Sequence, residues 1–182
     1  MNWGTVGADE LSATLWRERR QLDFLLFLLE TQLLHLRAGN WHRLNFTAAE
    51  LEKVLENLRF ESLARGVEAS ALAAEWKAPD QSTLPSLISL APPGLWPELL
   101  DDHCRGLTAL LAGIDLAAAR NIELLKAPPD EAGIPSLASG TNEAPGGDAD
   151  LDLLARDANI QRALAAVNSA TLTSLRDFLE LG

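Results

Sequence analysis

The sequence predicts an all-α protein: an antiparallel bundle of three long helices, a short connecting helix, and a C-terminal amphipathic helix that follows a flexible linker. Apolar residues, mostly leucine, recur at steps of three, four and seven over most of the chain, which is the period of helices with one buried face. All nine prolines fall within 77–97 and 127–150, so the stretches on either side of these intervals contain no proline. A hydrophobic content of 47% over 182 residues can fill the core of one ordinary domain.

The first helix is expected from about residue 9 to residue 38. At about 1.5 Å per residue it would be roughly 45 Å long, a length common in helical bundles. Ala38-Gly39 supplies its end, because glycine tolerates the left-handed conformation that follows the last turn of many helices. Its stripe comprises Leu11, Leu15, Leu22, Leu25, Leu29 and Leu36, widened by Leu26 and Leu33.

The second helix is expected over about 41–76, after a very short turn. Asn40 can cap it directly, and Thr47 with Glu50 forms a competing start in the pattern of a capping box. The periodicity favours the earlier start, because the apolar positions keep one phase through Thr47. A short connection places two helices antiparallel as a hairpin. The stripe contains Trp41, Leu44, Ala48, Leu51, Leu55 and Leu58.

The proline-rich interval 77–97 breaks this pattern. Within it, Thr83 followed by Leu84-Pro85 predicts a short capped helix over 83–90 with proline in its first turn. A third long helix is expected over about 95–126, ended by Pro128-Pro129. Its inner face contains Trp96, Leu100, Leu107, Leu110, Ile114, Ala117 and Leu125, with His103 and Asn121 on or beside it.

The remaining chain predicts a division into a helical core (1–126), an acidic Pro/Gly-rich linker (127–150) and a C-terminal helix (151–182). The linker interval contains four prolines, four glycines, five acids and no base, a composition typical of mobile segments. One helix is expected from about 150 to 181, although its centre, 168–174, is rich in poor helix formers. Such a helix is marginal alone and needs a surface to pack on.

Several segments occur in a characteristic order: LSATLWRER (11–19), LLFLLE (25–30), LRAG (36–39), AELEKVL (49–55), LR (58–59), the leucine-rich 83–90, and RNIELL (120–125). In this order and spacing they resemble the FlgN-type flagellar export chaperones, and SLRDFL (174–179) resembles a tail found in part of that group. The resemblance implies a cytosolic chaperone for the hook–filament junction proteins FlgK and FlgL, with components of the export apparatus as further partners. The resemblance also implies that the C-terminal region binds an amphipathic segment of the client before export.

The apolar stripe of the last helix is therefore the candidate client-binding surface, and ordinary packing within the chain is the alternative for the same residues. If packing is their role, the protein is a non-catalytic helical adaptor with a constitutive four-helix bundle. The sequence leaves the oligomeric state open. The candidate client-binding residues are Leu153, Ile160, Leu164, Val167, Leu172, Leu175, Phe178 and Leu179.

Composition argues against several other functions. A net charge of −11 disfavours nucleic acid and anionic membranes as partners. The longest apolar run, 24–29, is too short to span a bilayer, and the acidic N-terminus does not resemble a signal peptide, so a cytoplasmic location is expected. Cys104 is the single cysteine, and the three histidines lack metal-ligand spacing. We expect no catalytic site, no metal and no cofactor.

Overall fold

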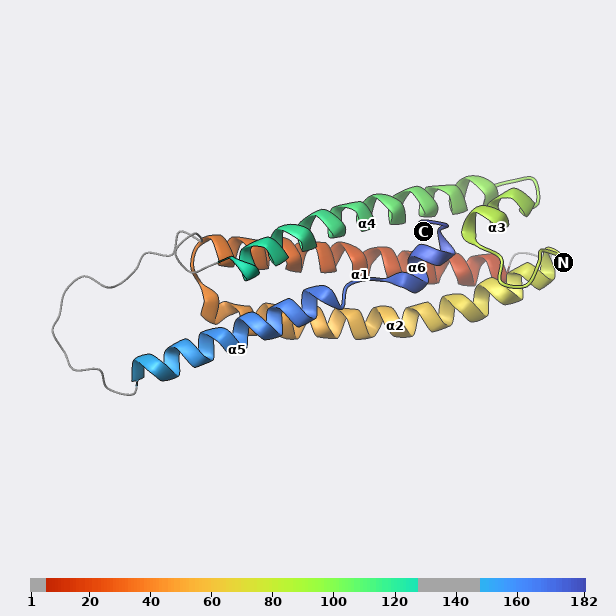
Figure 1. Ribbon diagram of the computed structural model, residues 1–182. Coiled ribbons are helices and arrows are strands. Elements are labelled where there is room, and N and C mark those ends of the chain that lie inside the picture. Colours follow the sequence, from red (N-terminus) through yellow and green to blue (C-terminus); the bar gives the residue numbers. More distant parts are fainter. Residues whose placement is uncertain (1–5, 128–147) are drawn as a thin grey trace. The chain divides into compact units, whose positions relative to one another are not determined.

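The computed structural model describes residues 6–127 and 148–182, and every regular element in them is helical (Figure 1), which confirms the all-α prediction. No β-strand occurs in these two ranges. The elements are α1 (Val6–Arg37), the 3₁₀ helix η2 (Trp41–Arg43), α2 (Leu44–Glu75), α3 (Leu84–Leu90), α4 (Trp96–Lys126), α5 (Asp148–Asn168) and α6 (Thr173–Phe178).

Helix α1 ends at a glycine in the left-handed conformation, as the sequence predicts. Gly39 has a φ of 70°, and the amide of Asn40 donates to the carbonyl of His35, the bond that closes a Schellman motif. The Asn40 side chain makes no capping hydrogen bond. Instead, the 3₁₀ turn leads directly into α2, which runs through Thr47 as the periodicity predicts.

The prediction of one continuous C-terminal helix is wrong. The chain forms α5 and α6, and Leu172 between them has a left-handed φ of 51°. The break falls among Asn168, Ser169, Thr171 and Thr173. Asn, Ser and Thr have low helix propensity because their side chains bond the backbone of turns or lose rotamer freedom in helices.

The chain divides into two compact units. The first unit comprises Met1–Phe24, Val54–Gly113 and Thr171–Gly182, and the second comprises Leu25–Lys53 and Ile114–Ala170. Each long helix therefore contributes one segment to each unit, α6 belongs to the first unit, and α5 belongs to the second. The predicted division at residues 126 and 150 stays a prediction, and 128–147 of the predicted linker lie outside the described residues.

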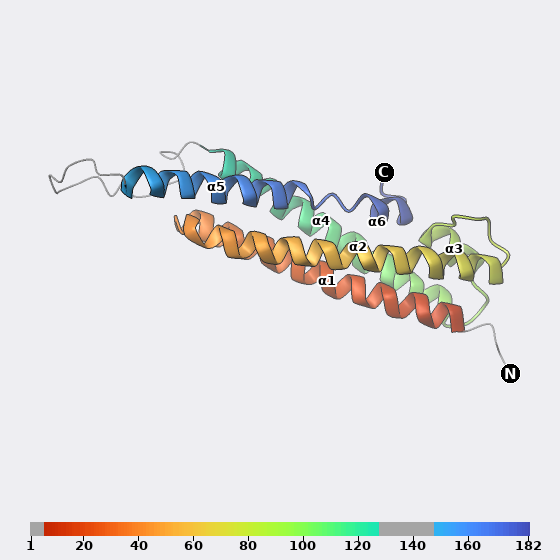
Figure 2. The ribbon, with the colours of Figure 1, turned by 90° about the horizontal axis from the view of Figure 1, so that it is seen from below.

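Leucines fill both cores, and most of them lie at positions that the periodicity predicts. In the first unit, α1, α2, α3, α4 and α6 all contribute buried leucines, among them Leu15, Leu58, Leu87, Leu107 and Leu175. In the second unit, the small side chains of Ala163, Ala166 and Val167 on α5 are buried together with leucines of α1 and α2. Two views show α5 alongside the first half of α2 (Figures 1 and 2). None of the described helices combines the length and apolar content of a membrane span.

Candidate functional site

The eight candidate client-binding residues fall into three groups of different exposure. Val167, Leu175 and Leu179 are buried. Four are half-buried: Ile160, Leu164, Leu172 and Phe178. Leu153 is more than half exposed. The eight residues do not lie on one helix: four are on α5, Leu172 lies at the break, and the other three lie in or directly after α6.

In the second unit, an arginine holds α5 to the start of α2. Arg162 Nε donates to Glu52 Oε1 at 3.0 Å, and its Nη2 donates to Glu52 Oε2 at 2.7 Å. Its Nη1 also donates to the side-chain oxygen of Asn45. The hydrogen bonds from Arg162 lower the pKa of Glu52, and the pKa of Arg162 is raised by the same contact. This bidentate ion pair links the face of α5 that carries Arg162 to α2.

Ile160 lies two residues before Arg162 and lines a small apolar pocket of the second unit. Arg156 lies one turn before Ile160 and lines the same pocket. The half-buried state of Ile160 is therefore explained by contacts within the chain. The other lining residues come from α1, η2, α2, α4 and the residues next to them: Leu36, Gly39, Trp41, Leu44, Leu124, Leu125 and Ala127.

The first turns of α5 are different, because large apolar side chains there are exposed. Leu151, Leu153 and Leu154 are each more than half exposed. At 100° per residue Leu151 and Leu154 share one face of the helix, and Leu153 points roughly 100–160° away from them. Exposed Asp150 and Asp152 alternate with them, so the first turns of α5 expose a mixture of apolar and acidic side chains. The sequence analysis named only Leu153, because Leu151 and Leu154 lie off the stripe that it followed.

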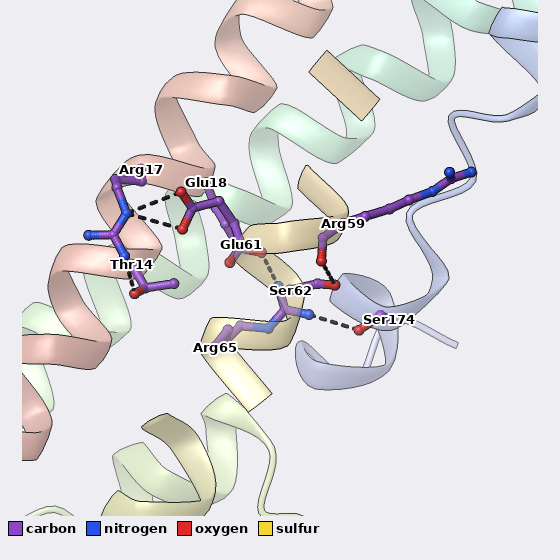
Figure 3. Close-up of polar contacts among 8 residues, drawn as sticks. All are labelled: Thr14, Arg17, Glu18, Arg59, Glu61, Ser62, Arg65 and Ser174. Carbon is purple, nitrogen blue, oxygen red and sulfur yellow. Dashed lines mark hydrogen bonds and ion pairs between the residues drawn. The ribbon is translucent and has the colours of Figure 1, made fainter. Parts of the chain in front are cut away.

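In the first unit, α6 rests against a buried ion pair. Arg65 of α2 bonds Glu18 of α1, and their side chains are only 3% and 1% exposed. Arg65 Nη2 also donates to Ser174 Oγ of α6 at 3.0 Å (Figure 3). The Arg65 guanidinium carbon lies 5.0 Å from the ring centroid of Phe178, within the range of a cation–π contact. One arginine therefore joins α1, α2 and α6.

The electrostatics of Glu18 are unusual for a paired carboxylate. Burial raises its pKa, and this effect exceeds the opposing effect of Arg65. Its Oε2 is buried and accepts no hydrogen bond from the described residues. An exposed pair runs nearby, in which Arg17 Nε donates to Glu61 at 3.1 and 3.2 Å. Loss of one partner should therefore lower the stability of the fold more at the buried Arg65–Glu18 pair than at the exposed Arg17–Glu61 pair.

The sequence analysis missed this pair, yet the leucine pattern contains a signal for it. The stripe of α1 steps by seven from Leu15 to Leu22, and Glu18 fills the gap. The stripe of α2 has its gap between Leu58 and Leu72, with Arg65 at the middle. A charged residue at a core position of each of two neighbouring helices indicates a buried pair, since an unpaired buried charge is costly.

A second polar cluster occupies the core of the second unit. Gln32 Nε2 donates to Asn121 Oδ1 at 3.0 Å, and Thr47 Oγ1 donates to Gln32 Oε1 at 2.8 Å. Asn121 Nδ2 donates to the carbonyls of Leu29 and Ala117. All three polar side chains are buried. Gln32 again fills a step of seven, between Leu29 and Leu36.

His103 and Cys104 stand side by side on α4, but their environments differ. His103 is fully buried, Ser12 Oγ lies 3.0 Å from its Nε2, and its ring meets Trp16 edge-on at 5.0 Å. Burial, and then the charge of Arg19, lower the pKa of His103 to about 4. Burial, and then Asp101, raise the pKa of Cys104, opposite to the shift of an activated thiolate. In the described ranges, no group of three or more His, Cys, Asp or Glu is placed to hold a metal.

Comparison with known proteins returned no match to a family model, to a curated protein or to a solved structure. A functional proposal therefore rests on the side chains of this chain and on the resemblance in its sequence.

Proposed function

We propose that this chain is a non-catalytic export chaperone of the FlgN type, which binds FlgK- or FlgL-like proteins in the cytoplasm before their secretion. In this proposal α1, α2 and α4 form an antiparallel three-helix scaffold, and the C-terminal helices bind an amphipathic segment of the client. The exposure of Leu151, Leu153 and Leu154 is the observation that carries the proposal. Large exposed apolar side chains gathered at one helix end indicate a surface that a partner covers.

The apolar surface is large enough to contribute to binding. Complete burial of a leucine side chain is worth about 1.5–3 kcal/mol, and more than half of each of these three remains exposed. Covering them would yield roughly 3–5 kcal/mol before the costs of association. That contribution alone is too small for tight binding, so the half-buried Ile160 and Leu164 would add to it if α5 adjusted on binding.

The test compares three forms of the full chain for binding to purified FlgK- and FlgL-like proteins by titration calorimetry. The first is the unaltered chain, and the second carries Leu151→Ser, Leu153→Ser and Leu154→Ser. The third is a matched control in which three leucines of similar exposure outside α5, at positions 34, 95 and 116, become serine. We expect affinity to fall at least about tenfold in the α5 variant and to stay within about twofold in the control. Equal losses in both variants would reject α5 as the client-binding surface.

The burial of Val167, Leu175 and Leu179 favours a second candidate, the non-catalytic adaptor whose C-terminal segment is a constitutive part of the bundle. Hydrogen exchange separates the two. The chaperone proposal expects the client to slow amide exchange at the start of α5, over about 150–160. The adaptor proposal expects α5 and α6 to exchange only with global unfolding, whether or not FlgK- or FlgL-like protein is present.

A further inference from the structure

A second apolar surface lies on α2, within the first unit. Phe60, Leu63 and Val67 are 62%, 68% and 73% exposed. Their spacing of three and four residues places them on one face of the helix. Ala71 and Ala74 are also exposed and continue this face toward the end of α2. We call these five residues the outer stripe.

The outer stripe lies opposite the face of α2 that enters the core. Leu58, Arg65 and Leu72 are buried, and at 100° per residue they point roughly 140–180° away from the centre of the stripe, near Val67. This part of α2 is therefore apolar on two opposite faces, of which the first unit covers one. An exposed patch on the order of a few hundred Å² commonly marks an interaction site.

One edge of the outer stripe is acidic. Glu61, Glu68 and Glu75 recur every seven residues, which aligns them along a single edge of α2. Glu61 accepts hydrogen bonds from Arg17, whereas Glu68 Oε2 is buried and accepts none from the described residues. Glu75 is exposed. On the opposite edge, Arg59 is exposed but paired with Glu56. The charges next to the stripe are thus mostly negative, since both arginines there, Arg17 and Arg59, are paired with glutamates.

This charge pattern decides which partner fits. Two copies of α2 packed antiparallel would bring their glutamate edges together, and each copy carries a net charge of −11. Like charges in such a position oppose association. A helix with lysine or arginine along the facing edge would meet Glu68 and Glu75 favourably.

We propose that the outer stripe is a docking surface for a basic amphipathic helix of another protein. The large side chains of Phe60, Leu63 and Val67 pack against the apolar stripe of that helix, in the helix-on-helix mode. The small side chains of Ala71 and Ala74 accept a larger apolar residue from the partner. The exposed Glu75 pairs with its basic edge, and the negative charge of the half-buried Glu68 attracts it. This surface is separate from α5 and does not depend on the chaperone proposal.

The experiment uses the full chain and two synthetic helical peptides of about 20 residues, labelled for fluorescence anisotropy. Both peptides carry leucine at every third and fourth position, and the remaining positions are lysine in one and glutamate in the other. We expect saturable binding of the lysine peptide alone. Leu63→Glu and Val67→Glu should each weaken it at least about tenfold, and both variants should fold normally because these side chains are exposed.

The matched control is Leu116→Glu, which adds the same charge at an exposed leucine of α4 and should change the peptide affinity less than about twofold. Glu68→Gln and Glu75→Gln should weaken binding and reduce its dependence on salt. Three results would overturn the proposal: equal binding of both peptides, equal effects of the Leu63 and Leu116 variants, or a dimer in sedimentation analysis that Leu63→Glu abolishes. The last result would assign the outer stripe to a second copy of the chain.

Discussion

Removal of Arg65 tests how the first unit holds α6. Arg65→Met keeps most of the apolar side chain but leaves the Glu18 carboxyl without its ion-pair partner. Losing one partner of a buried pair generally costs about 3–5 kcal/mol. The variant also loses the hydrogen bond to Ser174 and the contact with Phe178, which together contribute about 1 kcal/mol.

The carboxyl can bind a proton instead of remaining charged, and this limits the cost. Relative to the ordinary glutamate pKa of 4.5, holding a proton at pH 7 costs about 3.4 kcal/mol and at pH 5 only about 0.7 kcal/mol. Burial already raises the pKa of Glu18, and loss of Arg65 raises it further. A raised carboxyl pKa destabilises the folded state above pH 4.5, and this penalty grows with pH until the folded-state pKa is reached.

We therefore expect Arg65→Met to lower the free energy of unfolding by about 3–4 kcal/mol at pH 7 and by about 1–2 kcal/mol at pH 5. Urea titrations at several pH values between 5 and 7 measure both. Arg17→Met is the matched control, because its exposed pair with Glu61 should contribute less than about 1 kcal/mol. A loss below about 1 kcal/mol at pH 7, or one that does not change with pH, would refute the reasoning.

Three further predictions concern the core and the helix ends. Because the folded-state pKa of His103 is about 4 against an ordinary 6.5, stability should fall by roughly 3 kcal/mol between pH 6.5 and 4; His103→Gln should remove this dependence in pH-resolved denaturation. Lys77 after α2 and Gly39 after α1 both have a left-handed backbone, with φ of 55° and 70°. Lys77→Gly should therefore raise the free energy of unfolding by about 1 kcal/mol, and Gly39→Ala should lower it by about as much, as urea denaturation can measure. Asn121→Ala should cost about 2–4 kcal/mol in urea denaturation, because it leaves the buried Gln32 Nε2 without a partner and removes the second hydrogen bond to the Leu29 carbonyl.

The sequence predicts the long helices well, because each has a regular apolar stripe and a clear end signal. Leu11, Leu51 and Leu107 are buried as expected, and Gly39 ends α1 in the predicted conformation. The short helix α3 also begins as predicted, with Thr83 accepting a hydrogen bond from the Ser86 amide. These features depend on residues close together in the chain.

The candidate site is harder to predict because it depends on distant pairs. Arg65 and Ser174 are 109 positions apart, and Arg162 and Glu52 are 110 apart. Periodicity shows which residues share a helix face but does not show which other helix that face meets. For this reason it groups Leu153 with Leu175, although one is exposed and the other is buried.

The buried ion pair also explains why α2 leaves an apolar stripe outside. In the first unit, both Leu58 with Leu72 and Leu63 with Val67 form apolar faces of α2, so burial of leucine alone does not decide which face turns inward. A half-turn rotation of this segment would cover Leu63 and Val67 but carry Arg65 away from Glu18, and an unpaired buried carboxylate costs more than a few exposed methyl groups gain. We infer that Arg65 and Glu18 select the observed orientation. The exposure of the outer stripe is then a consequence of how the core is specified, and a partner can use that surface without unfolding any part of the first unit.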